Sequence, residues 1–205
     1  MRIGEGHGRE TGPSGAVPMR VISGKARGRK LKRVPGDSTR PIMDRVKENL
    51  FNILGSFVPG SRWLDLFAGT GQVGIEALSR GAEHVVFVDK VTPAVRTTHD
   101  NLRHTHLEEG ATVLQRDAFR YLEDPQGAPF DLIYVAPPQY MGLWVQVLNR
   151  LDQEPGRFLD PQGLVVAQID PKEEEELPLK NLTLVDRRRY GSTLLLFYEP
   201  PVNVT

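Results

Sequence analysis

The stretch DLFAGTGQVGIEAL, residues 65–78, places a glycine-rich turn between an apolar strand and an apolar helix. Gly69, Gly71 and Gly74 form a G-x-G-x-x-G pattern, in which glycine permits a tight turn and lets a ligand approach the backbone closely. Asp89 ends the next apolar stretch, 20 residues after Gly69, where an acid can bind ribose hydroxyls. The pattern predicts a nucleoside-cofactor site, and it fits NAD as well as S-adenosylmethionine.

Apolar strands alternate with helices along most of the chain. We expect strands at 62–67, 84–89, 111–115, 130–135 and 163–169, and helices near 43–54, 72–80, 93–104 and 142–151. Such alternation predicts an α/β fold with a doubly wound, mostly parallel sheet. Two last strands, 182–190 and 192–199, meet tightly at Gly191 and can pair only as an antiparallel hairpin. The expected fold is therefore a Rossmann-like sheet of seven strands.

The net charge of zero over 205 residues hides an asymmetry. Residues 1–50 hold 12 Lys and Arg against 5 Asp and Glu, and the rest hold 14 against 21. A basic patch at one end of a neutral chain indicates a polyanionic partner or a solvated tail. The absence of cysteine excludes disulfides, thiolate zinc sites and cysteine nucleophiles, and it fits a cytoplasmic setting. No apolar run is long enough to predict a membrane span.

Composition, charge and periodicity together divide the chain into four segments. Residues 1–18 are expected to be a disordered extension, 19–40 a small basic β-hairpin that could contact a polyanion, 41–200 the main domain and 201–205 a tail. The hairpin is a candidate for tracking phosphates, together with Arg45 and Lys47 of the segment after it. The principal candidates are Lys25, Arg27, Arg29, Lys30, Lys32, Arg33 and Arg40.

Two acids help to identify the cofactor. Asp65 lies at the strand end before the glycines, where an acid disfavours a dinucleotide pyrophosphate and suits the positive charge of S-adenosylmethionine. Asp117 follows the third strand and could accept from an adenine amine, with the N–H of Ala118 donating to a ring nitrogen. The alternative for Asp117 is a helix N-cap.

The stretch IYVAPPQY, residues 133–140, ends the fourth strand on two prolines. Pro137 and Pro138 remove two N–H donors and hold the preceding residues extended, so that nearby carbonyls project as fixed acceptors. Such acceptors can orient an exocyclic amine for methyl transfer, and Tyr140 could stack on a flipped-out base. The simpler alternative is a turn that merely ends the strand.

Six stretches of the chain, in this order, resemble the RsmD-type family of 16S rRNA guanine-N2 methyltransferases over residues 19–199. They are RVISGKARGRKL (20–31), TRPIMDRVKENLFNIL (39–54), DLFAGTGQVGIEALSRGA (65–82), FVDK (87–90), RDAF (116–119) and RRRYGSTLLLFYE (187–199). The resemblance implies a methyltransferase fold that uses S-adenosylmethionine. It also implies a guanine target in the 16S rRNA of a 30S subunit or its assembly intermediate. We expect a cytoplasmic monomer without metal.

The resemblance also implies site residues. Those for the cofactor are Asp65, Phe67, Gly69, Thr70, Gly71, Asp89, Lys90, Asp117 and Ala118, and those for the reaction are Ala136, Pro137, Pro138, Gln139 and Tyr140. The family has an acid at the position of Ala136, followed by two prolines and an aromatic residue. Loss of this acceptor predicts activity about 10²–10³-fold lower, with Gln139 as a replacement acceptor in the same turn.

Three alternatives remain at this stage. The chain could methylate another amine in DNA or protein, or it could bind the methyl donor and RNA without catalysis, because Ala136 replaces the expected acid. An NAD-dependent oxidoreductase is the third, and Asp65 and the Pro-Pro turn both disfavour it.

Overall fold

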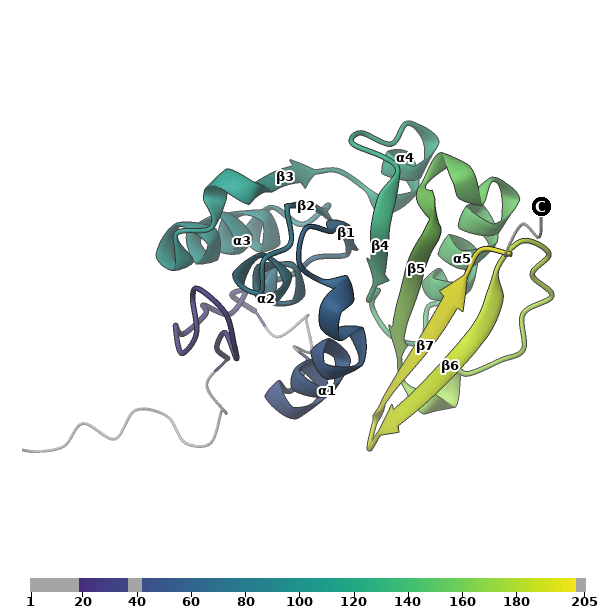
Figure 1. Ribbon diagram of the computed structural model, residues 1–205, viewed down its shortest axis with the longest axis horizontal. Coiled ribbons are helices and arrows are strands. Elements are labelled where there is room, and N and C mark those ends of the chain that lie inside the picture. The colour runs from purple at the N-terminus through teal and green to yellow at the C-terminus, as the bar shows by residue number, and fades with distance from the viewer. Residues whose placement is uncertain (1–18, 37–41, 202–205) are drawn as a thin grey trace, which may run out of the picture.

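A computed structural model describes residues 19–36 and 42–201 (Figure 1). The described residues form one seven-stranded sheet in the order β3-β2-β1-β4-β5-β7-β6. Five strands are parallel: β1 (Arg62–Leu66), β2 (His84–Asp89), β3 (Ala111–Gln115), β4 (Phe130–Val135) and β5 (Leu159–Ile169). The hairpin of β6 (Thr183–Tyr190) and β7 (Thr193–Glu199) is antiparallel, and β7 pairs with β5.

Helices cover both faces of the sheet. The helices α1 (Asp44–Leu54), α2 (Gln72–Ser79) and α3 (Thr92–Thr105) share one apolar core, while α4 (Ala118–Glu123) and α5 (Leu143–Gln153) belong to the other. Side chains alternate between the faces along each strand, so Trp63 packs in the first core and Leu64 in the second. Both cores are apolar because parallel strands are buried on both sides.

The predicted doubly wound sheet, its helices and its C-terminal hairpin are confirmed, with boundaries within a few residues of those expected. The sequence pattern missed α4, because its six residues are too few to show a helical period. The predictions for residues 1–18, for Arg40 and for the tail beyond residue 201 concern parts outside the described residues. No helix in the described ranges is long and apolar enough to cross a membrane.

The segment 19–36 folds back on itself as an irregular hairpin. Arg20 and Lys30 form an antiparallel bridge, and the N–H groups of Leu31 and Val21 donate to the carbonyls of Met19 (2.8 Å) and Arg29 (3.0 Å), but no regular strand forms. Its apolar side chains instead join the core of the main domain, Met19, Val21, Ala26 and Leu31 among them. The segment is therefore part of the folded domain and not an independent arm.

Glu76 of α2 fixes this segment to the domain. Its buried carboxylate accepts hydrogen bonds from the backbone N–H of Ile22 (2.7 Å) and of Ser23 (3.0 Å). Arg80 donates to the same carboxylate at 2.8 Å. A single acid thus satisfies two backbone donors that a loop would otherwise bury without partners.

Lys47 completes this network, and our prediction that it contacts phosphates is wrong. Its side chain is 0% exposed, its Nζ lies 3.5 Å from Glu76 Oε2, and it donates to the carbonyl of Arg20 at 2.5 Å. Burial lowers the pKa of Lys47, and the charge of Glu76 acts in the opposite direction. The sequence could not show this, because a lysine in an amphipathic helix is normally assigned to the solvent-exposed face and its partner lies 29 residues away.

We expect Glu76→Gln to lower the free energy of unfolding by about 3–5 kcal/mol, because it leaves the buried Lys47 without its counter-charge. Adding Lys47→Met should recover part of this loss. The measurement is urea unfolding followed by circular dichroism. Glu83→Gln, at an exposed position, is the matched control. A change below about 0.5 kcal/mol for Glu76→Gln would contradict this role.

Candidate active site

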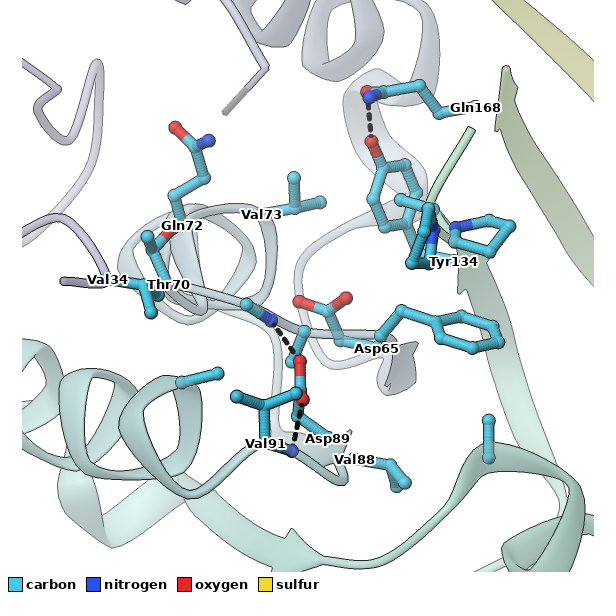
Figure 2. A pocket seen from close by; sticks show the side chains of 18 of the residues that line it. Val34, Asp65, Thr70, Gln72, Val73, Val88, Asp89, Val91, Tyr134 and Gln168 are labelled. Carbon is cyan, nitrogen blue, oxygen red and sulfur yellow. Dashed lines mark hydrogen bonds between the residues drawn. The ribbon is translucent and has the colours of Figure 1, made fainter. Parts of the chain in front are cut away.

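A cavity of about 480 Å³ opens at the carboxyl ends of β1, β2 and β4 (Figure 2). Connections that leave neighbouring parallel strands at this edge create such a crevice, which is where α/β sheets bind ligands. The cavity is lined by Val34, Ile42, Asp65, Phe67, Ala68, Gly69, Thr70, Gln72, Val73, Val88, Asp89, Lys90, Val91, Ala94, Ala118, Tyr134, Ala136, Pro137, Pro138, Gln139 and Gln168.

The glycine turn is held in place by Asp89 at the end of β2. One carboxylate oxygen accepts from the N–H of Gly69 at 2.9 Å, and the other accepts from the N–H of Val91 at 2.8 Å, as the dashed lines in Figure 2 show. These two bonds connect the turn, the strand and the start of α3. Since each carboxylate oxygen has two lone pairs, Asp89 can still accept from ribose hydroxyls in the cavity.

Two glycines of the turn are required for steric reasons. Gly71 has a left-handed φ of 73°, and a Cβ there would lie 2.8 Å from the Thr98 side chain. At Gly74, a Cβ would lie 2.3 Å from the Phe87 ring, so glycine lets α2 pack closely on the sheet. The first glycine shapes the turn, and the second sets the distance between helix and strand.

Asp65 is the buried acid of the cavity, and Figure 2 shows its carboxyl group at the centre of the site. It is 2% exposed and lies beside Tyr134 in the pairing of β1 with β4. The pKa of Asp65 is raised to about 8, mainly by burial. A hydrogen bond from the Gly74 N–H at 3.2 Å acts in the opposite direction, and the charge of Asp89 raises the pKa further. Asp65 is therefore poised to ionise when a cation enters.

Asp117 caps a helix in this structure and is not among the residues that line the cavity. Its Oδ1 accepts from the N–H groups of Phe119 (3.0 Å) and Arg120 (3.4 Å), and its Oδ2 lies 3.5 Å from Lys90 Nζ. Ala118 does line the cavity, and as the first residue of α4 it has an N–H without an acceptor inside the helix. An adenine contact from Asp117 stays a prediction.

The turn after β4 forms another wall of the cavity, apart from the glycine turn. Ala136, Pro137, Pro138 and Gln139 line the cavity, whereas Tyr140 is 64% exposed with a left-handed φ of 61°. The N–H of Tyr140 donates to Glu173 Oε1 at 2.7 Å, which fixes the backbone of the turn. Tyr140 thus presents its ring outside the residues that line the cavity.

The structure brings together most of the predicted cofactor residues. One cavity is lined by Asp65, Phe67, Gly69, Thr70, Asp89, Lys90 and Ala118, whereas Gly71 and Asp117 do not line it and are the N-caps of α2 and α4. Of the predicted RNA-binding residues, Arg29 is half-buried, and Lys25, Arg27, Lys30, Lys32 and Arg33 are exposed. Two of them are tied to α3: Arg29 donates to the His104 carbonyl at 2.5 Å, and Lys32 to Asp100 at 3.0 Å.

Sequence reasoning missed three polar residues of the cavity. Tyr134 is buried in β4 and donates from its hydroxyl to Gln168 Oε1 at 2.5 Å, and Gln72 begins α2. In the sequence, Tyr134 is indistinguishable from a core residue of an apolar strand. The only available signal was that Gln72 and Gln168 are amides at the ends of otherwise apolar segments.

Comparison with known proteins identifies relatives over nearly the whole chain. The family model described as Conserved hypothetical protein 95 matches residues 19–199. The Bacillus subtilis protein YlbH, which carries a provisional rRNA methyltransferase name, is 40% identical over 88% of this chain and 98% of its own. Ribosomal RNA small subunit methyltransferase D of Haemophilus influenzae is 32% identical over 91% of this chain and 96% of its own.

A solved structure supports the fold at lower identity. The RNA methyltransferase of Salinibacter ruber, in complex with S-adenosyl-L-homocysteine, superimposes with a TM-score of 0.62 at 13% identity. The match covers 81% of this chain and 97% of that one. The two chains therefore share the doubly wound architecture.

The raised pKa of Asp65 gives stability a defined pH dependence. Because the folded value is about 8 against an ordinary 3.8, the folded state holds this proton more tightly. Its contribution to stability is complete below pH 3.8 and is lost as pH rises through 8. Relative to Asp65→Asn, the wild type should lose up to about 1.4 kcal/mol of unfolding free energy per pH unit in this range.

The test is chemical denaturation of both proteins, without ligand, at several pH values from about 5 to about 8. Asp65→Asn should become the more stable protein toward the upper end. Parallel stability profiles for the two proteins would show that Asp65 ionises normally in the folded state.

Proposed function

This chain belongs to the family described as Conserved hypothetical protein 95, the RsmD-type rRNA methyltransferases, and from that premise we propose its reaction. The protein transfers a methyl group from S-adenosylmethionine to the exocyclic N2 amine of a guanine in 16S rRNA. It acts as a cytoplasmic monomer on a 30S subunit or its assembly intermediate. Guanine N2 is the target that the family resemblance implies for the turn at Ala136–Tyr140.

The observation that carries the proposal is the pairing of a buried acid with a ribose-binding acid in one cavity. Both acids line it: the charge of Asp89 disfavours a phosphate beside the glycine turn, and buried Asp65 gains its charge most readily next to a cation. S-adenosylmethionine carries a sulfonium and an ammonium group and no phosphate, so it fits these two acids. A dinucleotide would bring its pyrophosphate to the same turn, which argues against an NAD-dependent oxidoreductase.

In this proposal one set of residues binds the cofactor and another binds the target amine. When bound, the cofactor supplies an electrophilic methyl group. Asp89 orients the ribose, and ionised Asp65 favours the cationic end of the ligand. On the opposite wall, the carbonyls of Ala136 and Pro137 accept from the target amine and hold its lone pair toward the methyl group.

Alanine at position 136 weakens the hydrogen bonding of the target amine but leaves the geometry of the turn after β4 unchanged. A carboxylate at this position would accept a charge-assisted hydrogen bond from the amine as it becomes positive. Gln139 lines the same wall and offers a neutral acceptor in its place. The second candidate function, a binding module without catalysis, rests on this one residue.

The basic segment 19–36 supplies the contact with RNA in this proposal. Its exposed cations lie on a segment that also contributes Val34 to the wall of the cavity, so a bound phosphate backbone would run close to the site. Contacts of this kind position the RNA and do not read its sequence. The target nucleotide would then be chosen by the shape of the ribosomal particle and by the base pocket.

Methyl transfer to undermethylated 30S subunits, followed with a labelled methyl donor, tests the activity. We expect the wild type to transfer label, and Ala136→Asp to raise the rate by up to about 10²–10³-fold, because it restores the carboxylate acceptor. Gln139→Ala should lower the rate without weakening cofactor binding. Binding of the methyl donor without transfer by the wild type, with transfer only by Ala136→Asp, would favour the silent binding module.

Charge reversal tests the RNA contact better than deletion, because deletion of the segment would also remove part of the core. The triple variant Lys25→Glu, Arg27→Glu and Lys30→Glu should weaken RNA binding and reduce the slope of log K against log salt by about 0.7–0.9 per lost phosphate contact. Affinity for S-adenosylhomocysteine should stay within about twofold, since these side chains do not line the cavity. Unchanged RNA affinity would place the RNA on another surface.

A further inference from the structure

Gln72 carries an unsatisfied hydrogen-bond acceptor inside the cavity. The residue is 5% exposed, and its Oε1 is the one buried side-chain nitrogen or oxygen without a hydrogen-bond partner across residues 19–36 and 42–201. Leaving such an atom unpaired costs about 1–3 kcal/mol, so buried acceptors of this kind are normally satisfied. Because Gln72 lines the cavity, a ligand is the natural source of the missing donor.

The position of Gln72 restricts which ligand group can reach it. It is the first residue of α2, directly after Gly71, so its backbone is set by the glycine turn. Figure 2 shows its side chain beside Thr70, apart from Asp65 and Asp89, which lie close to each other near the centre of the view. Gln72 therefore belongs to the β1 end of the cavity, away from the ribose-binding acid.

The donors of S-adenosylmethionine are few, which allows an assignment by elimination. They are the adenine amine, the ribose hydroxyls and the ammonium group of the methionine part. In the proposed function the ribose is assigned to Asp89, at the end of β2, and the adenine to the side of Ala118, which follows β3; both residues line the cavity. The ammonium group is then the donor left for the turn between β1 and α2.

We propose that Gln72 is a binding residue for the α-ammonium group of the cofactor, accepting one of its hydrogen bonds through Oε1. The inference rests on the proposed use of S-adenosylmethionine. Asp65 supplies negative charge to the same end of the ligand, and Gln72 adds a directed neutral acceptor. An ammonium group has three donors, so both contacts can form together.

The target amine is the competing donor, and the layout of the cavity disfavours it. The turn at Ala136–Gln139 follows β4, whereas Gln72 begins α2 at the β1 side. Figure 2 places Gln72 and Gln168, the latter at the end of β5, on separate sides of the cavity. A target amine bound at the turn after β4 would donate to acceptors of that turn and not to Gln72.

The test compares two ligands that differ in the amino acid part. S-adenosylhomocysteine carries the ammonium group, and 5′-methylthioadenosine keeps the adenosine and thioether but lacks it. Gln72→Met preserves the length of the side chain and removes the acceptor. We expect it to weaken S-adenosylhomocysteine binding roughly 10- to 100-fold, as for a hydrogen bond to a charged group, and to leave 5′-methylthioadenosine within about twofold.

Isothermal titration measures both affinities, and Gln162→Met, at an exposed position, is the matched control. The melting temperature of ligand-free Gln72→Met should not fall, because an unpaired buried oxygen is replaced by an apolar group. Equal weakening of both ligands, or no weakening of either, would overturn the proposal. So would a slower methyl transfer with unchanged S-adenosylhomocysteine affinity, which would assign Gln72 to the RNA substrate. Wild-type protein that binds neither ligand would instead contradict the proposed function itself.

Discussion

The candidate site depends on two carboxylates, those of Asp65 and Asp89, which accept hydrogen bonds from backbone N–H groups in and next to the glycine turn. Asp89 binds the N–H groups of Gly69 and Val91, and Asp65 binds the N–H of Gly74. These bonds fix the turn before any ligand arrives, so the cavity is preorganised. They also bring two acids into a confined space, where burial of Asp65 raises its pKa. A cationic ligand relieves that cost, and this links the stability of the turn to the choice of cofactor.

A second set of charges attaches the N-terminal segment. Glu76 binds the backbone of Ile22 and Ser23 and is balanced by Lys47 and Arg80. The network places a basic segment next to the cavity, to which the segment contributes Val34. The positive charges thus form two groups with different roles. Lys47 and Arg80 pair with Glu76 and so stabilise the attachment of the segment, whereas the exposed lysines and arginines of the segment are accessible to a polyanion.

Most of the fold follows from the sequence, because buried parallel strands are long apolar runs and the helices between them show a clear period. The cofactor edge was also predictable, since Gly69, Gly71 and Asp89 follow successive strands. Contacts between distant residues were not: Lys47 resembled a surface cation until Glu76 was placed beside it. The role of Asp117 was ambiguous for a related reason, because an N-cap and an adenine contact require the same residue at the same position.

Gln72 shows a different limit of sequence reasoning. An amide next to an apolar segment is only a weak sequence signal, and the three-dimensional arrangement is needed to reveal that its oxygen is buried and unpaired. Ala136 shows the opposite case. The sequence alone marks it as a departure from the family pattern, while the structure displays an ordinary strand end that lines the cavity. The fold tolerates this substitution, and in the reaction that we propose its effect would fall on the hydrogen bonding of the target amine.

We propose that this cavity methylates guanine N2 in small-subunit rRNA. Mass spectrometry of nucleosides from the 16S rRNA of cells with and without the gene tests it most directly. We expect one N2-methylguanosine to disappear when the gene is removed and to return when it is restored. An unchanged methylation pattern, or the loss of a methyl group from another position, would contradict it.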